Sequence, residues 1–362
     1  MTEPEQDWID AGLYDPLAPT AHERLELLRW LAGHGVTLDQ MVAGCAENQL
    51  GSIVGDSMLR PGRRLTIGEV AAETGLTVAE VAEIRRGSGF PEAAPTDSVY
   101  VEDDLEMFRA FKAALEFFSP GELVHFTRVI GSSLRRIAEA AGEMFLRDVE
   151  APMLGQASEL DKAQATLAGI LLARGATAVF DPMFRAHLEL STRTTRQARA
   201  GMQDYATVPL TIAFVDLNGF TTRSGEVSPE ELLQLVMSFE STAIDVVSGH
   251  GGRLIKLIGD EVMFSTVEPT VACHIAAEII DGAHTWATSA RGGIAHGPVL
   301  ASGGDVYGEV VNLASRIADI AVPGELLVNE AVMHSAADLR FEPAGRRQLK
   351  GFPQPVRLWS VV

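Results

Sequence analysis

The chain has 362 residues, enough for about two domains, and 46% of them are hydrophobic, which is ample for two cores. The formal net charge of −20 argues against broad, non-specific binding to nucleic acid or to an anionic membrane, but it leaves room for a nucleotide held by local basic residues and metal ions. Only two cysteines are present, Cys45 and Cys273, which argues against a disulfide framework and fits a reducing cytosol.

The first half of the chain shows the apolar spacing of helices. Leucines cluster at helical spacing between Ala21 and Gly33, and helical patterns continue to about residue 190. We predict an all-α domain over residues 1–182. A helical connector follows over residues 183–206, beginning after Asp181-Pro182, and it carries four arginines: Arg185, Arg193, Arg196 and Arg199.

The sequence predicts neither a signal peptide nor a membrane span. Met1 to Asp10 is acidic, whereas a signal peptide begins with basic and apolar residues. The apolar stretch Ala163 to Phe180 is interrupted by Arg174 and falls short of the length that a bilayer requires. We therefore expect a cytoplasmic protein with no membrane partner.

The segment from Leu65 to Arg86 has the pattern of a helix, a glycine turn, a capping Thr77 and a second helix, and so resembles a helix-turn-helix. One interpretation is a DNA-binding element, with several arginines nearby. The other is a small helical pair inside a larger domain, and the strong overall acidity favours this second interpretation. We do not expect nucleic acid as a partner. The nearby arginines are Arg60, Arg63, Arg64, Arg85 and Arg86.

From Thr207 onward, strand and helix patterns alternate. The order β-α-β-β-α-β is that of a split βαβ unit, with a buried strand, a helix that begins with Pro229, a hairpin, a second helix and another strand. These elements are predicted at Val208–Val215, Ser228–Ser248, Arg253–Ile258 with Glu261–Thr266, Glu268–Ala287 and Arg291–Ala295. Further elements are a strand at Val299–Ala301, a helix at Val310–Ile320, a strand at Glu325–Asn329 and a β region over Phe341–Val362.

Two carboxylates follow apolar strands in this second half. Asp216 comes directly after the first strand, and Asp260 lies in the tight turn of the hairpin. If the strands are neighbours, the two side chains meet at one edge of the sheet, where hard oxygen ligands suit Mg²⁺ or Mn²⁺. A single aspartate of this kind is usually a turn or cap residue, but two at paired strand ends favour a metal site.

A third stretch completes a set of motifs. It runs from Asp305 through Tyr307, Gly308 and Asn312 to Arg316. Together with the two aspartate motifs, it resembles the class III nucleotidyl cyclases over roughly Val208 to the C-terminus. The resemblance implies an α+β protein in which an all-α regulatory domain precedes a ferredoxin-like cyclase domain over residues 207–362. It also implies that ATP is converted to 3′,5′-cyclic AMP and pyrophosphate.

The resemblance also implies a role for each matching residue. Asp216 and Asp260, with the backbone carbonyl of Leu217, would hold two Mg²⁺ or Mn²⁺ ions. Lys256 and Asp305 would recognise adenine, because an ammonium donor and a carboxylate acceptor match its edge and mismatch guanine. The remaining contacts would come from Asn312 to the ribose, Arg316 to the transition state and Lys350 to the terminal phosphates. Pro298 departs from the pattern, since some family members have a phosphate-binding arginine there.

In this family the site lies at a head-to-tail dimer interface, so a homodimer of this chain would form two complete sites and a monomer none. The domain plan resembles bacterial soluble cyclases with an autoinhibitory, pH-responsive N-terminal domain. His187 and His296 are our candidate proton sensors.

An alternative function is a transcriptional regulator with a cyclase-like nucleotide-sensing domain. A dinucleotide cyclase is disfavoured because the chain has no Gly-Gly-Asp-Glu-Phe signature.

Overall fold

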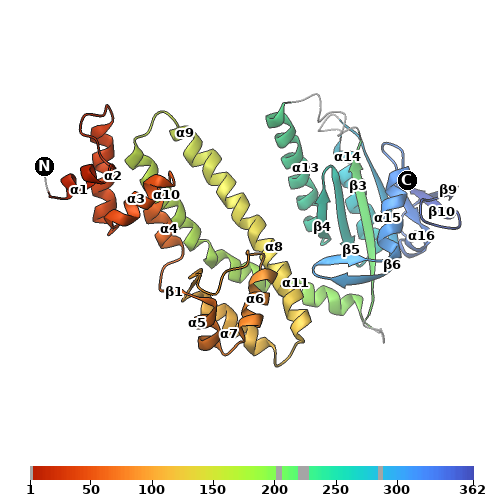
Figure 1. Cartoon of the computed structure of the whole chain (residues 1–362). Helices are drawn as coiled ribbons and strands as arrows, with labels where there is room; N and C mark the ends of the chain where they lie inside the picture. Colours follow the sequence, from red (N-terminus) through yellow and green to blue (C-terminus); the bar gives the residue numbers. More distant parts are fainter. Residues whose placement is uncertain (1–2, 201–205, 219–227, 284–287) are drawn as a thin grey trace. The chain divides into compact units, whose positions relative to one another are not determined.

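The computed structural model describes residues 3–200, 206–218, 228–283 and 288–362. The chain forms two compact units, Met1–Arg185 and Ala186–Val362 (Figure 1). The N-terminal unit is almost entirely helical, as the apolar spacing predicts. The second unit is built around a mixed sheet, so the chain is an α+β protein.

Helices make up the first unit, apart from one short antiparallel pair of strands, β1 and β2, in its described part. The elements are α1 (Glu3–Asp10), α2 (Ala21–Gly33), α3 (Leu38–Ala46), α4 (Ile53–Leu59), β1 (Arg64–Leu65), α5 (Ile67–Thr74), α6 (Val78–Gly87), β2 (Tyr100–Val101), α7 (Asp104–Ala114), α8 (Pro120–Phe145), a π-helical turn (Leu146–Glu150), α9 (Ala151–Met153), α10 (Glu159–Gly175) and α11 (Thr177–Ala198).

Two separate clusters of apolar side chains hold these helices together. The first joins α2, α3 and α4 to α10 around Leu28, Leu31 and Met41, each at most 1% exposed. The second joins α5, α6 and α7 around Val70 and Phe108, both fully buried. Because a single core does not span the unit, it has two sub-structures that can respond to a change separately.

The predicted helix–turn–helix pair is present as α5 and α6. Thr66 and Thr77 each cap a helix in a reciprocal capping box, and Gly75 ends α5 with a φ of +70°. The local arginines are largely engaged with carboxylates or rings, which lowers the positive charge offered to a phosphate backbone. Arg63 pairs with Glu69 and Glu73, Arg60 with Asp104 and Arg86 with Glu92, while Arg85 stacks on Phe90 and Tyr100.

Two expectations about the helices before the second unit are wrong. Pro182 does not begin a helix, because it lies inside α11, which starts five residues earlier at Thr177. The apolar stretch is also longer than expected: among the described residues, Glu159–Ala198 is the one helical stretch long and apolar enough to cross a membrane by length and composition. Arg174 lies within this stretch, in the last turn of α10, and does not shorten it below the length of a span. Several of its apolar side chains are exposed, among them Leu171, Leu172 and Val179, whereas Ala163 and Ala198 are buried.

The second unit contains an eight-stranded sheet in its described part, with the order β4-β5-β3-β6-β8-β10-β9 and β7 paired to β6 (Figure 1). All pairings are antiparallel except β6 with β8. The first strands and helices follow one another as β3, α13, β4, β5, α14 and β6, which confirms the ferredoxin-like βαββαβ arrangement. The strands are β3 (Val208–Leu217), β4 (Arg253–Ile258), β5 (Glu261–Thr266), β6 (Ala290–Ser302), β7 (Asp305–Tyr307), β8 (Leu326–Asn329), β9 (Phe341–Arg347) and β10 (Val356–Val361).

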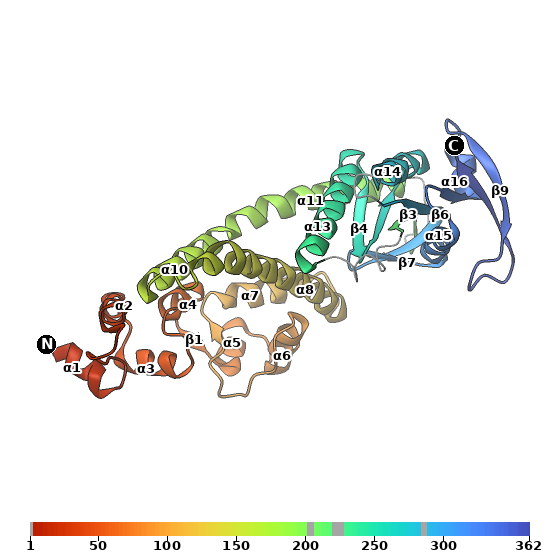
Figure 2. The ribbon, with the colours of Figure 1, turned by 90° about the horizontal axis from the view of Figure 1, so that it is seen from above.

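Helices cover both faces of this sheet, and Figure 2 shows α14 and α15 on opposite sides of the strands. The central strand β3 is buried on both faces: Ala213 and Val215 pack toward α14, and Ile212 and Phe214 pack toward α15. This explains why its sequence is a continuous apolar run rather than an alternating one. The covering helices are α13 (Pro229–Gly249), α14 (Pro269–Gly282), α15 (Glu309–Ile320) and α16 (Glu330–Ser335).

The predicted strand and helix limits need three corrections. Strand β3 continues through Asp216 to Leu217, because both residues still pair with β6 and the Leu217 side chain is 2% exposed. The two predicted strands at 291–295 and 299–301 are one strand, β6, which pairs with β3 along its first ten residues. Helix α14 ends at Gly282, and residues 284–287 of the predicted helix lie outside the described residues.

Candidate active site

Asp216 and Asp260 lie at the same end of neighbouring strands. Asp216 is directly opposite Glu261 in the β3–β5 ladder, and Asp260 is the residue just before Glu261. The Leu217 N–H donates a hydrogen bond of 3.1 Å to the Asp260 carbonyl oxygen, which holds the two backbones together at this point. The structure therefore brings together Asp216, Leu217 and Asp260.

The turn before Glu261 places Asp260 where carboxylates crowd. Gly259 supplies the φ of +67° that the tight turn requires. Burial raises the pKa of Asp260, and the Asp216 carboxylate raises it further, against the opposing effect of Arg291. For the same reasons, with burial first and Asp216, Asp319 and Asp260 adding to it, the pKa of Glu261 rises to about 7. Burial and the neighbouring carboxylates thus both oppose the ionisation of Asp260 and Glu261.

Arg291 is a residue of this edge that sequence reasoning did not include. It lies directly opposite Asp216 in the β3–β6 ladder, and its Nε and Nη2 donate to Asp216 Oδ2 at 3.2 and 3.0 Å. Its Nη1 donates to the carbonyl oxygens of Asp319 and Ala321, at 2.9 and 3.3 Å. The available signal was a single charged residue at the start of an otherwise small and apolar strand, Arg291-Gly-Gly-Ile-Ala.

The donor set at this edge fits a divalent cation shared with a substrate. Among the described residues, no group of three or more His, Cys, Asp or Glu side chains could enclose a metal ion by itself. Two half-buried carboxylates beside a strand-end carbonyl instead resemble the incomplete coordination that Mg²⁺ keeps when phosphate oxygens supply other ligands. A bound cation would favour the charged form of Asp260, whose pKa is raised by burial and by the Asp216 carboxylate.

Lys256 and Asp305 form a second polar pair. Lys256 lies on β4 opposite Met263, just after a bulge at Ile255 that sets the direction of its side chain. Asp305 begins β7, and its Oδ2 accepts a 2.7 Å hydrogen bond from Lys256 Nζ. Burial alone would raise the pKa of Asp305, but the hydrogen bonds from Lys256 and the Val306 N–H more than offset this, so the pKa of Asp305 is lowered. The predicted base-recognition residues are thus already paired.

Helix α15 carries Asn312 and Arg316. It packs directly on β6, because a Cβ on Gly293 would lie 2.2 Å from the Ala318 nitrogen, so no larger residue fits there. Asn312 is exposed, whereas Arg316 is 40% exposed and its Nη1 donates to Asp319 Oδ2 at 2.6 Å. An exposed pair of this kind contributes roughly 0–1 kcal/mol, so Arg316 can exchange Asp319 for a phosphate at little cost.

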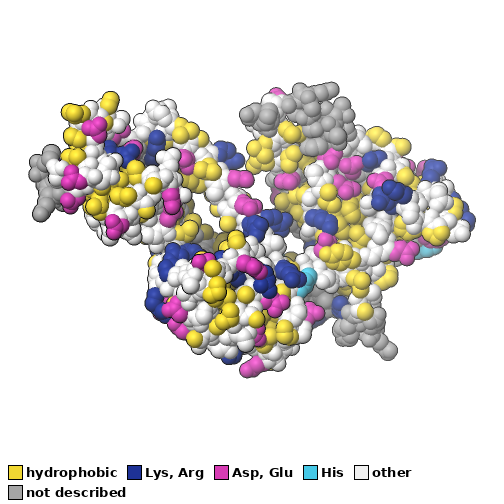
Figure 3. Space-filling model, in the orientation of Figure 1, with side chains coloured by type: hydrophobic (Ala, Val, Ile, Leu, Met, Phe, Trp, Pro, Cys, Tyr) yellow, Lys and Arg dark blue, Asp and Glu magenta, His cyan; other side chains and the backbone are white. Residues whose placement is uncertain are grey.

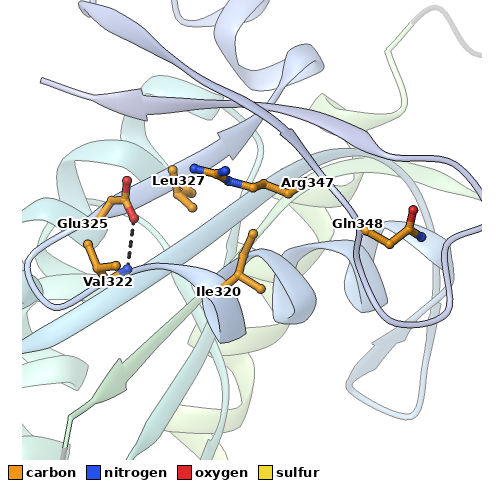
Figure 4. A pocket seen from close by; sticks show the side chains of 6 residues that line it. All are labelled: Ile320, Val322, Glu325, Leu327, Arg347 and Gln348. Atoms are coloured by element: carbon orange, nitrogen blue, oxygen red, sulfur yellow. Dashed lines mark hydrogen bonds between the residues drawn. The ribbon is translucent and has the colours of Figure 1, made fainter.

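Lys350 lies exposed in the turn after Leu349, whose own side chain is buried. A pocket of about 240 Å³ lies nearby, between the C-terminal end of α15, β8 and the end of β9. Figure 4 shows Glu325 accepting a hydrogen bond from the Val322 N–H at its wall, while Arg347 extends along it. The other lining residues are Ile320, Leu327 and Gln348. Pro298, which replaces an arginine of the family pattern, lies within β6 and is exposed.

His296, a predicted proton sensor, does not lie beside Asp216 and Asp260, the predicted metal ligands. It pairs with Thr211, five residues before Asp216 on β3, which corresponds to roughly 16 Å along the strand. Because successive side chains of a strand point to opposite faces of the sheet, His296 also lies on the opposite face from Asp216. Its Nδ1 is 2.9 Å from the Thr211 hydroxyl, and burial lowers the pKa of its imidazole. His187 lies exposed on α11.

Charged groups of both signs share the surface. On the face shown in Figure 3, acidic and basic side chains are interspersed, and hydrophobic side chains reach the surface in several places. Exposed apolar residues are frequent on the long helices, for example Ile130 and Leu134 on α8 and Met183 and Leu188 on α11.

Known proteins match this chain along nearly its whole length. The profile of the adenylate cyclase regulatory domain matches residues 6–195, and that of the adenylate and guanylate cyclase catalytic domain matches residues 202–361. An uncharacterized protein of Mycobacterium tuberculosis is 31% identical over 97% of this chain and 92% of its own length. A pH-sensitive adenylate cyclase of the same species is 29% identical over 100% and 94%. The crystal structure of the adenylyl cyclase CyaB from P. aeruginosa is 24% identical, covers 42% of this chain and 93% of that chain, and has a TM-score of 0.40.

The fold and the motifs therefore define a class III nucleotidyl cyclase domain behind a helical regulatory domain. Since the regulatory-domain profile alone matches more than half of the chain, the chain belongs to the family of adenylate cyclases that carry this domain. It is an adenylate cyclase, a lyase that forms cyclic AMP.

Proposed function

We propose that the enzyme converts ATP to 3′,5′-cyclic AMP and pyrophosphate with two divalent cations, at two sites shared across a homodimer. The observation that carries this proposal is the pairing of Asp216 with Asp260 at adjacent strand ends, joined by the hydrogen bond from Leu217 to the Asp260 carbonyl. In the proposed dimer one subunit provides these aspartates and the other provides Lys256, Asp305, Asn312 and Arg316. A monomer would then be inactive.

Asp216, Asp260 and the Leu217 carbonyl would hold Mg²⁺ or Mn²⁺. When bound, these ions lower the pKa of the ribose 3′-hydroxyl and balance the charge that develops on the phosphates. The crowding of carboxylates at this edge supports the assignment, because burial first and the neighbouring carboxylates second raise the pKa of Asp260 and Glu261, and a bound cation would favour their charged forms.

Lys256 and Asp305 favour ATP over GTP. Adenine presents an acceptor at N1 and a donor at its amino group, which match the Lys256 ammonium and the Asp305 carboxylate. Their 2.7 Å hydrogen bond orients both groups before the base arrives, so binding orders few additional side-chain torsions. Guanine presents the opposite donor and acceptor pattern and would leave both charges unmatched.

The remaining contacts come from α15 and the turn after β9. Asn312 is one helical turn from Arg316 and exposed, so it can orient the ribose while Arg316 stabilises the phosphate charge. Lys350 would contact the terminal phosphates. Because Pro298 lacks a charge, Lys350 and Arg316 would contribute more of the phosphate binding than in relatives with an arginine at that position.

We also propose that the N-terminal unit controls activity in response to pH. Two observations support this: a relative of similar length is a pH-sensitive adenylate cyclase, and α11 contains the boundary between the two units. The last residue of α11, Ala198, is 7% exposed and belongs to the core cluster under α15. A change in α11 can therefore reach the catalytic core. We propose that the reaction takes place in the cytoplasm, which supplies ATP and Mg²⁺.

The test is a cyclase assay on the full chain with ATP or GTP and Mn²⁺, with identification of the product. Formation of cyclic AMP from ATP supports the proposal. Formation of cyclic GMP from GTP alone, or of no cyclic nucleotide, contradicts it. The same assay from about pH 5.5 to about pH 8 on the full chain and on residues 186–362 tests regulation. A cut at residue 186 keeps Ala198 in place. Identical pH profiles would remove a sensing role for the N-terminal unit.

A further inference from the structure

A continuous line of polar contacts runs from Asp216 to Arg316. Arg291 Nη2 donates to Asp216 Oδ2 at 3.0 Å, and Arg291 Nη1 donates to the Asp319 carbonyl oxygen at 2.9 Å. The Asp319 carboxylate in turn accepts a 2.6 Å hydrogen bond from Arg316. A strand-end carboxylate is thereby joined to the helix that carries the two proposed catalytic side chains, Asn312 and Arg316.

The planar guanidinium of Arg291 is suited to this connection. Its Nε and Nη2 bind one carboxylate oxygen, while Nη1 donates to the Asp319 carbonyl in the last turn of α15 and to the carbonyl of Ala321, the residue just after the helix. The Asp319 carbonyl lies at the negative end of the helix dipole, so a cation there is favourable. A lysine can place its charge beside Asp216, but its single ammonium cannot reproduce the fork that also reaches the helix end.

The packing around Arg291 is close enough that a displacement at the C-terminal end of α15 moves the whole helix. Arg291 is 27% exposed and Asp216 is 21% exposed, so water screens their interaction only in part. Two residues along the same strand, Gly293 lets the backbone of α15 lie directly on β6. A close-packed contact of this kind cannot deform continuously, so a change at one end of α15 moves the helix as a body.

We infer that Arg291 is a positioning residue that couples the Asp216 carboxylate to the C-terminal end of α15, so that the charge at Asp216 sets how firmly the helix bearing Asn312 and Arg316 is held. This inference rests on the proposed function for the roles of Asp216, Asn312 and Arg316. In the proposed dimer, Asp216 and α15 of one chain serve different sites, so Arg291 connects the two catalytic centres.

The test is a double-mutant cycle read by hydrogen exchange of the α15 backbone amides, in the full chain without metal ions. The variants are Asp216→Asn, Arg291→Lys and the double variant, with mass spectrometry following a peptide that covers residues 309–322. Arg346→Lys, alone and with Asp216→Asn, is the matched control, because Arg346 is exposed on β9 and its side chain takes no part in this line of contacts. Arg291→Lys retains the charge, and Arg291→Gln serves as a second variant should the lysine variant fail to fold.

We expect Asp216→Asn to speed exchange at the end of α15 by about five-fold in the wild-type and Arg346→Lys backgrounds, and by less than about two-fold in the Arg291→Lys background. An equal effect in all backgrounds, or no effect on α15 in the wild type, would overturn the inference. Cyclic AMP production by the wild-type chain is measured in parallel. A wild type that makes no cyclic AMP contradicts the proposed function, whereas the exchange cycle judges the coupling by itself.

Discussion

Two polar clusters lie in the catalytic unit, and their charges are balanced in opposite ways. At the end of β3, the carboxylates Asp216, Asp260 and Glu261 share one guanidinium among the described residues, that of Arg291, and burial helps to raise the pKa values of Asp260 and Glu261. On β4 and β7, Lys256 and Asp305 form a one-to-one pair, and the pKa of Asp305 is lowered.

The difference indicates two kinds of binding site. In its described part, the carboxylate edge has more carboxylates than cationic side chains, so it is suited to an exchangeable cation such as Mg²⁺. The Lys256–Asp305 pair is already satisfied, so it is suited to reading the hydrogen-bond pattern of a base with little rearrangement.

Removing one carboxylate from the acidic edge should have the largest effect. Asp216→Asn or Asp260→Asn removes a charge that the proposed cations require, and we expect kcat/KM with ATP and Mn²⁺ to fall at least about 100-fold. Asp338→Asn is the matched control, because Asp338 accepts only a 3.2 Å surface hydrogen bond from Thr270 among the contacts described. Activity within about three-fold of wild type in either edge variant would contradict the metal assignment.

Changing the balanced pair should alter nucleotide choice more than turnover. Lys256→Ala leaves the Asp305 carboxylate without its partner and removes the donor to adenine N1, so we expect kcat/KM for ATP to fall about 10- to 100-fold. Combining Lys256→Glu with Asp305→Gly should shift the preference toward GTP. The measurement is the ratio of kcat/KM for ATP and GTP, and an unchanged ratio would exclude these residues from base recognition.

Glu261→Gln should stabilise the metal-free enzyme in alkaline solution. The pKa of Glu261 rises from its ordinary value of 4.5 to about 7 in the folded chain, so its contribution to stability is present below about pH 4.5 and is lost as the pH rises through 7. Allowing for its partial exposure, we expect the variant to gain about 1 kcal/mol at pH 8 relative to acidic solution.

Thermal unfolding in the presence of a chelator, at several pH values, measures the difference in stability between Glu261→Gln and the wild type. Added Mn²⁺ should reduce it, because the ions balance the same cluster of carboxylates. A difference that does not change with pH would show that the Glu261 side chain is ionised alike in the folded and unfolded chains.

Asp319→Asn should have a modest effect on substrate binding. It frees Arg316 from an exposed ion pair of 2.6 Å but leaves the backbone carbonyl that Arg291 binds. We therefore expect KM for ATP to fall about two- to five-fold, within the range of an exposed pair, while kcat changes little. A raised KM would indicate instead that Asp319 holds Arg316 in its productive orientation.

His296→Gln should have the smallest effect. Burial lowers the pKa of His296 in the folded chain, so its contribution to stability is present above the unfolded pKa of about 6.5 and is lost as the pH falls through the folded pKa. The variant should therefore lose less stability than wild type between neutral and acidic pH, while the pH profile of activity stays unchanged. A shifted activity profile would restore His296 as a sensor.

The sequence determined the elements that local chemistry controls. Apolar runs and the Gly259-Asp260 turn gave the hairpin limits, because strand burial and turn geometry depend on neighbouring residues. The spacing of four between Asn312 and Arg316 placed both on one helix in the same way. The motifs around Asp216, Asp260 and Asp305 identified the family before any contact was known.

Only the tertiary structure decided which distant residues meet. Arg291 is 75 residues from Asp216 in sequence, and its place opposite that carboxylate follows from the β3–β6 register. The same register moved His296 away from the acidic edge and merged two predicted strands into β6. Register depends on pairing between whole strands, and such long-range pairing is set by the packing of α14 and α15 on the two faces of the sheet rather than by any short stretch of sequence.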